Sequence, residues 1–149
     1  SESAIKDNLQ EEMLRILLKR FIILCTRIAR EKFSVSPERE KAFDMVRQFY
    51  VLVDNHFKEK KMVQDYANML HRSPKTLSNL FTTCGLPSPL RIIHERIEAE
   101  AKRLLLYSQK SAKEITEILG FEDQATFSRF FKKMTGESVS EYRKREKQE

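Results

Sequence analysis

The chain has 149 residues, of which 40% are hydrophobic and 34% are charged, a composition typical of a folded, soluble protein rather than a disordered one. Its 28 Lys and Arg residues outnumber its 22 Asp and Glu residues, and the resulting net charge of +6 suits a polyanionic partner. Three glycines and four prolines favour an all-α fold and are too few for a phosphate-binding glycine loop.

The first predicted element is a helix over residues 5–32 with a wide apolar face. Its apolar run is interrupted by Lys19 and Arg20, so no membrane span is expected. Two interpretations of the face stay open: it packs on the next helix, or it pairs two copies of the chain. The width of the face favours pairing. The candidate dimerisation residues are Leu14, Leu17, Phe21, Leu24 and Ile28.

A second helix is predicted from the cap at Ser36 and Pro37 to about His56. The residues expected to face inward are Phe43, Val46, Phe49, Tyr50 and Val53. Beyond residue 60 the helices are shorter and clearly capped, except for one long helix over 89–107. The short helices are predicted over 62–70, 74–84, 111–119 and 124–135, with a last turn capped by Ser138 and Glu141.

The second half of the chain contains a repeat. Leu77, Leu80, Phe81 and Cys84 have the same spacing as Phe127, Phe130, Phe131 and Met134, fifty residues later. The helices that precede them also match, with one residue added in the second turn. The chain therefore holds two copies of a helix-turn-helix unit, in which the apolar stripe of each second helix builds a small core.

The opposite face of each second helix is polar. At 100° per residue it presents two sets of side chains, which are Lys75, Ser78, Asn79 and Thr82 in the first copy, and Ala125, Ser128, Arg129 and Lys132 in the second, with Gln124 at the leading end. Such donors suit the major groove of B-form DNA, where Arg can bind guanine and Asn or Gln can bind adenine. The helix over 89–107 would be about 28 Å long, close to the roughly 34 Å rise of one DNA turn. It can therefore place the second helix of each unit, which we call the reading helix, in successive major grooves. The basic excess agrees, because residues 57–149 carry 18 Lys and Arg against 13 Asp and Glu.

These features resemble the DNA-binding domain of the AraC/XylS family of bacterial transcription regulators over residues 40–145. The most specific match is EITEILGFEDQATFSRFFKKMTGESVSEYR, and Arg96, Ala101, Leu104 and Leu105 in the linking helix support it. The resemblance implies a linker or dimerisation helix over 1–35 and a DNA-binding domain over 36–149. In that domain, helix-turn-helix units over about 60–86 and 111–136 flank the linking helix over 88–107.

The resemblance also implies function. It implies sequence-specific regulation of transcription in the bacterial cytoplasm, on the nucleoid, with double-stranded DNA as partner, RNA polymerase as a further candidate, and a sensing or dimerising domain in the intact protein. The two cysteines agree with a reducing cytosol. The implied base contacts come from Lys75, Ser78, Asn79, Gln124, Ser128 and Arg129. The candidate phosphate contacts are Arg72, Thr82, Arg91, Lys113, Lys132 and Lys133.

Three positions depart from the family pattern. Thr116 stands where the family usually has Ala, and Val139 where it usually has Pro; we expect both to be tolerated. Thr82 and Thr83 stand where basic residues are common, which predicts a weaker phosphate contact in the first unit.

Two other functions are alternatives to DNA binding. An enzyme finds little support, because no nucleophile is paired with a base and His94-Glu95 lacks the second His of a zinc-protease helix. No cofactor or metal is therefore expected. The second rival is a helical protein-interaction adaptor without specific DNA binding, whose DNA affinity would not depend on salt.

Overall fold

The computed structural model describes residues 2–32 and 36–147, and the side chains of its first helix at Glu11 and residues 13–29. Within these ranges it contains only helices, without a strand, as predicted. They are α1 (Glu2–Lys32), α2 (Pro37–His56), α3 (Val63–Met69), α4 (Pro74–Thr83), α5 (Pro89–Tyr107), α6 (Ala112–Ile118), α7 (Gln124–Thr135) and α8 (Val139–Glu146). None of the helices in this described part is long and apolar enough to cross a membrane.

The chain divides into two compact units, residues 1–41 and residues 42–149. The first unit consists mainly of α1, which begins three residues before the predicted start. Its apolar stripe is exposed: Leu14 and Phe21 keep 67% and 64% of their surface accessible. Leu17, Leu24 and Ile28 are also more than half exposed. All five predicted pairing residues of α1 are therefore exposed.

Helix α2 buries a narrower stripe than its sequence indicates. Val46, Phe49 and Val53 are buried as predicted, but Phe43 is 56% exposed and Tyr50 is 42% exposed, so their inward placement was wrong. Phe49 contacts the rings of Tyr66 and Phe81, with centroids 5.6 Å and 5.0 Å away. The buried stripe faces α3, α4 and α5, and Phe43 and Tyr50 lie beside it.

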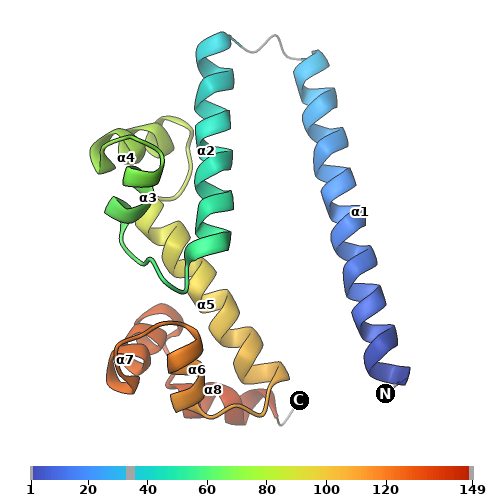
Figure 1. Ribbon diagram of the computed structural model, residues 1–149, viewed down its shortest axis with the longest axis vertical. Helices are drawn as coiled ribbons and strands as arrows, with labels where there is room; N and C mark the ends of the chain where they lie inside the picture. Colours follow the sequence, from blue (N-terminus) through green and yellow to red (C-terminus); the bar gives the residue numbers. More distant parts are fainter. Residues whose placement is uncertain (1, 33–35, 148–149) are drawn as a thin grey trace. The chain divides into compact units, whose positions relative to one another are not determined.

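The first helix-turn-helix unit is formed by α3 and α4 at one end of α5 (Figure 1). The Ser73 hydroxyl caps α4 by accepting from the Thr76 N–H, and Pro74 follows as the first helical residue. Leu77 and Phe81 are fully buried. The predicted core stripe of α4 is therefore confirmed.

Helix α5 is shared by the two helix-turn-helix units, because α3 and α4 pack on it, and so do α6, α7 and α8 (Figure 1). Its predicted inward residues are all buried: Ile92, Ile93, Ile97, Ala101, Leu104 and Leu105.

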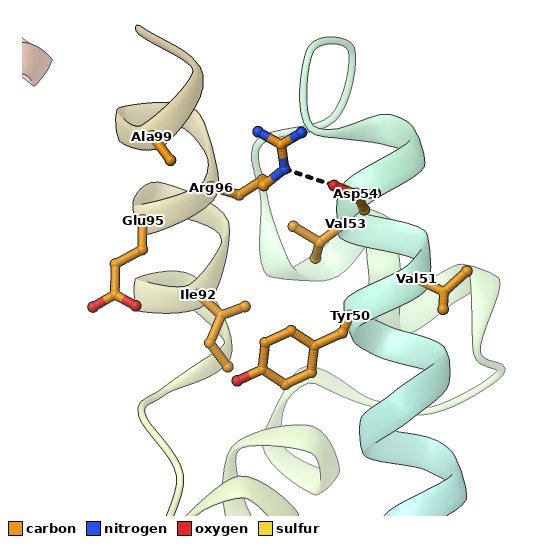
Figure 2. Close-up of a pocket in the computed structure, with 8 residues that line it drawn as sticks. All are labelled: Tyr50, Val51, Val53, Asp54, Ile92, Glu95, Arg96 and Ala99. Atoms are coloured by element: carbon orange, nitrogen blue, oxygen red, sulfur yellow. Dashed lines mark hydrogen bonds and ion pairs between the residues drawn. The ribbon is translucent and has the colours of Figure 1, made fainter. Parts of the chain in front are cut away.

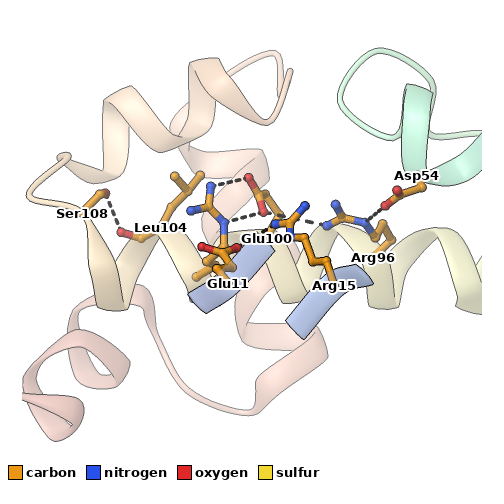
Figure 3. Close-up of polar contacts among 8 residues, drawn as sticks. Glu11, Arg15, Asp54, Arg96, Glu100, Leu104 and Ser108 are labelled. Carbon is orange, nitrogen blue, oxygen red and sulfur yellow. Dashed lines mark hydrogen bonds and ion pairs between the residues drawn. The ribbon is translucent and has the colours of Figure 1, made fainter. Parts of the chain in front are cut away.

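A polar network ties α2 to α5. Arg96 donates to Asp54 at 2.7 Å and lies 3.8 Å from Glu100, which also accepts two bonds from Arg103 (Figure 3). The Arg96 guanidinium stacks on the buried Phe57 ring, 4.1 Å from its centroid. These contacts hold the pKa of Glu100 below its usual value, mainly through the hydrogen bond from Arg103. Glu100 is thus a buried but paired carboxylate.

A groove between α2 and α5 lies beside this network. Tyr50, Val53, Ile92 and Ala99 line it, and the Asp54–Arg96 ion pair crosses it (Figure 2). Burial raises the pKa of the Tyr50 phenol, and nearby Glu95 adds to this effect. The groove is mainly apolar, with charged groups at its rim.

The second helix-turn-helix unit is formed by α6 and α7, closed by α8. The capping boxes of Ser111 with Glu114 and Ser138 with Glu141 are both present, and the second opens a helix of eight residues rather than a single turn. Phe127 and Phe131 are fully buried. The core stripe of α7 is therefore confirmed as well.

The two turns have the same backbone geometry despite their different lengths. In the first, Arg72 N–H bonds the Ala67 carbonyl and His71 has φ +53°; in the second, Phe121 N–H bonds the Thr116 carbonyl and Gly120 has φ +72°. In each turn, the preceding helix ends in a Schellman motif, with one residue in the left-handed conformation. The repeat seen in the sequence is thus a repeat of structure.

Candidate nucleic-acid interface

The outer face of α4 is open to solvent. Lys75, Ser78, Asn79 and Thr82 are all exposed, on the side opposite the buried Leu77 and Phe81. The Thr82 hydroxyl donates to the Ser78 carbonyl at 2.9 Å, and the Thr83 hydroxyl donates to the Asn79 carbonyl at 2.9 Å. Short polar side chains near the start of α4, with Lys75 beside them, can approach base edges closely.

The outer face of α7 carries the longer donors. Gln124, Ala125 and Arg129 are exposed, whereas Ser128 is only half-exposed because it borders the buried side of the helix. Gln124 is the first residue of α7, so it projects from the leading end as predicted. The face therefore combines an amide, a guanidinium and a hydroxyl.

Arg129 is oriented by neighbours on its own helix, which the sequence reasoning did not identify. Its Nη2 lies 3.3 Å from the Thr126 Oγ1, one turn earlier. Asp123 caps the same turn by accepting from the Thr126 N–H, and this bond lowers the pKa of Asp123, as does the charge of Arg129 to a lesser degree. The i, i+3 spacing of Asp123, Thr126 and Arg129 was the available signal.

The candidate phosphate contacts are all solvent-exposed, but they differ in their present partners. Arg91 forms an exposed ion pair with Glu95 at 2.8 Å. Lys132 and Lys133 lie in the last turn of α7, and Arg72 lies in the first helix-turn-helix turn. The full set is Arg72, Thr82, Arg91, Lys113, Lys132 and Lys133.

His94 lies where α5 meets α7. Its ring contacts Phe130 edge-on, with centroids 5.3 Å apart. Burial lowers its pKa, and the charge of Lys133 adds to this effect. The imidazole therefore packs against Phe130 of α7 in surroundings that favour its neutral form.

Comparison with known proteins identifies the family. An AraC-type helix-turn-helix domain matches residues 66–145, which cover the first unit from Tyr66 onward, the linking helix and the second unit. The chain belongs to the AraC/XylS family. This family consists of transcription regulators, and the rival interpretation as an adaptor is not favoured.

Two similar proteins support this assignment. YisR of Bacillus subtilis, an uncharacterized helix-turn-helix transcriptional regulator, is 30% identical over 81% of this chain and 41% of its own length. The C-terminal domain of AraT, a response regulator from Geobacillus stearothermophilus, is 29% identical, with a TM-score of 0.62 over 67% of this chain and 84% of that one.

A third protein has a similar fold, and its structure contains bound DNA. The DNA-binding domain of AdpA, a global transcriptional factor solved in complex with a target DNA, is 23% identical, with a TM-score of 0.56 over 68% of this chain and 88% of that one. The chain spans less than half the length of the curated relatives that it matches.

Two departures from the AraC/XylS pattern fit the fold. Thr116 is buried, and its hydroxyl donates to the Ala112 carbonyl at 2.7 Å, so no hydrogen-bonding group is left unsatisfied. Val139 is the first residue of α8, directly after the Ser138 cap, and is itself buried. A proline would favour the start of the helix by restricting the backbone at this position, whereas Val139 contributes the packing of its buried side chain.

Proposed function

We propose that this chain binds promoter DNA by placing α4 and α7 in successive major grooves on one side of the duplex. The observation that carries the proposal is that two capped helices, each with a buried apolar stripe and an outward row of hydrogen-bond donors, pack on one shared helix. The 19 residues of α5 correspond to about 28 Å, close to one turn of DNA.

Within this interface we assign the base contacts to the six outward side chains. In α7, Arg129 has the geometry to donate two bonds to guanine, and Gln124 can pair with adenine. In α4, Asn79 can do the same, with Lys75 and Ser78 beside it. Ser128 contributes a shorter contact because it is only half-exposed.

The phosphate contacts set the orientation of the protein on the duplex and do not contribute to sequence specificity. Arg72, Lys113, Lys132 and Lys133 are exposed cations close to the helix-turn-helix turns and helix ends. Arg91 would have to exchange its Glu95 partner for a phosphate. Thr82 offers a hydroxyl alone, so we expect the second unit to bind the backbone more strongly than the first.

Selection from random duplexes tests the proposal. The chain is mixed with a random DNA library, the bound fraction is amplified over several rounds, and the enriched sequences are aligned. We expect a bipartite motif with its halves about 10 base pairs apart. Enrichment of a single short half-site, or of no motif, would contradict the assignment of two reading helices.

We further propose that α1 pairs two copies of the chain through Leu14, Leu17, Phe21, Leu24 and Ile28. The support is that these side chains are all more than half exposed, on a helix long enough for about four heptads. Sedimentation equilibrium should show a dimer that becomes a monomer in the double variant Leu17→Glu and Leu24→Glu. A monomeric wild-type chain at high micromolar concentration would contradict the pairing.

For the whole protein we propose regulation of transcription in the bacterial cytoplasm, on the nucleoid, with a sensing or dimerising domain joined to this one. RNA polymerase is the partner through which such a regulator would act. Crosslinking from the DNA-bound chain to purified polymerase on the selected site would test this; absence of any crosslink would contradict it.

A further inference from the structure

The short turn after α2, residues 57–61, contacts the second helix-turn-helix unit although it belongs to the first. A side chain built on Gly120, in the turn between α6 and α7, would overlap the Lys58 carbonyl oxygen and lie 3.1 Å from the Lys61 ammonium. The Lys61 ammonium donates to the same carbonyl at 2.7 Å and lies 5.1 Å from the centre of the Phe121 ring. The turn and Gly120 therefore touch directly.

The repeat shows that this contact adds a requirement for glycine at position 120 beyond the positive φ of the turn. His71 occupies the matching position of the first unit with φ +53°, so this left-handed turn accepts a side chain there. Gly85 and Gly136 adopt φ +68° and +81°, and an added Cβ would meet nothing at either. Among these left-handed positions, Gly120 alone has backbone from another element in the space that a Cβ would take.

The 57–61 turn is itself held in place by the first unit. Phe57 lies beneath the Arg96 guanidinium of α5, and the Tyr66 hydroxyl of α3 donates to the Lys60 carbonyl at 2.7 Å. Burial raises the pKa of Tyr66 to about 12, so the phenol keeps the proton that it donates. Because contacts with both α5 and α3 hold this turn, it can fix the position of the residues that it touches instead of moving away from them.

On the other side of the contact, Phe121 connects to the recognition helix. Its ring lies 5.4 Å from Phe127 and 5.3 Å from Phe130 of α7, between ring centroids. Phe121 also lies in the stretch where the second turn is one residue longer than the first. A displacement of Gly120 would therefore also displace α7, through the contacts of Phe121 with Phe127 and Phe130.

We propose that the 57–61 turn is a strut that fixes the angle between α4 and α7, and that Gly120 and Lys61 are positioning residues for the spacing of the two DNA half-sites. The inference rests on the proposed function, since spacing matters only if both helices read DNA. Two linked reading units gain affinity only when their geometry lets both engage at once. The strut supplies that geometry beside α5.

The test compares Gly120→Ala with Gly136→Ala, which introduces the same side chain at a left-handed residue of the same unit but into open space. Binding is measured to the selected bipartite duplex, to versions with one or two base pairs added or removed between the halves, and to the α7 half-site alone. We expect Gly120→Ala to lose about tenfold or more at the preferred spacing relative to Gly136→Ala. Binding to the half-site should match that of the control.

Lys61→Met is the second variant, because it keeps the apolar stem and removes the ammonium that bonds Lys58 and faces Phe121. We expect it to weaken the spacing preference in the same direction, and it carries the test if Gly120→Ala does not fold. Equal losses on the half-site and the bipartite duplex, or an unchanged spacing preference in both variants, would overturn the inference. The wild-type spacing preference reports on the proposed function separately.

Discussion

At the scale of single residues, one of the proposed base contacts is already oriented in the chain without DNA. Arg129 is held near Thr126 on α7, and Thr126 is in turn fixed by the Asp123 cap. A guanidinium that is already restricted loses less conformational entropy when it binds a base. This favours Arg129 as a base contact over a freely moving surface cation.

Replacing Arg129 by Ala should weaken binding to the selected site by about 1–3 kcal/mol and relax the preference at one base pair. The cause is the loss of a two-bond contact to a single base. Affinities for the selected site and its single-base variants, measured by fluorescence anisotropy, check this. Lys133→Ala is the control, since a phosphate contact should cost the same on every sequence. An equal loss on all sequences for Arg129→Ala would reduce its role to phosphate binding.

His94 makes the stability of the domain depend on pH. Its pKa is lowered in the folded state, so the unfolded chain binds a proton more readily. Stability should therefore fall as pH drops from 7 through the unfolded-state value of about 6.5 and below. Melting temperatures measured between pH 7 and pH 5 should fall less for His94→Phe, which keeps a ring against Phe130. Parallel curves for the two proteins would contradict this account.

At the scale of elements, α5 joins the two reading units and α2 is attached to it by the Arg96 network. Arg96 combines an ion pair with Asp54 and a stacking contact on buried Phe57. The side chain of Arg96 is 32% exposed and that of Asp54 is 65% exposed, so solvent screens the ion pair. We infer that Arg96 stabilises the α2–α5 contact mainly by stacking and hydrogen bonding.

Replacing Arg96 by Met should lower the free energy of unfolding by about 1–2 kcal/mol, through loss of the stacking and of the bond to Asp54. The matched control is Arg91→Met on the same helix, whose exposed pair with Glu95 should contribute at most about 0.5 kcal/mol. Urea denaturation followed by circular dichroism measures both. Equal effects of the two substitutions would show that the network adds nothing beyond a surface ion pair.

The helices and their caps could be predicted from the sequence because their signals are local. Ser73, Ser111, Asp123 and Ser138 each cap the helix that the sequence indicated. The inward placement of Phe43 and Tyr50 was wrong because the sequence of α2 shows the width of its apolar face, but not how much of that face the neighbouring helices cover. The contact of Gly120 with Lys58 was missed for a related reason, since no periodicity links residues 62 positions apart. The repeat offered one clue, because the position that matches Gly120 holds His71.

At the scale of the whole molecule, binding of the chain to DNA requires electrostatic attraction. The basic excess lies in residues 57–149, which include both reading units. Five of the six candidate phosphate contacts are cations: Arg72, Arg91, Lys113, Lys132 and Lys133. Each phosphate that they neutralise releases counterions from the duplex.

The logarithm of the binding constant should therefore fall against the logarithm of salt concentration with a slope of about −4 to −5 if all five cations contact phosphates. Lys132→Ala should reduce the magnitude of that slope by about 1. Titrations with the selected duplex between about 50 and 200 mM salt measure both values. A flat response would favour the adaptor interpretation instead.

The most direct measurement of the central claim is methylation interference on the selected duplex. Methylation of guanine N7 blocks the major groove, and methylation of adenine N3 blocks the minor groove. With α4 and α7 in successive major grooves, interference should appear at guanines in two clusters about 10 base pairs apart. Arg129→Ala should remove interference in only one of them. A single cluster, or interference confined to adenine N3, would contradict the account.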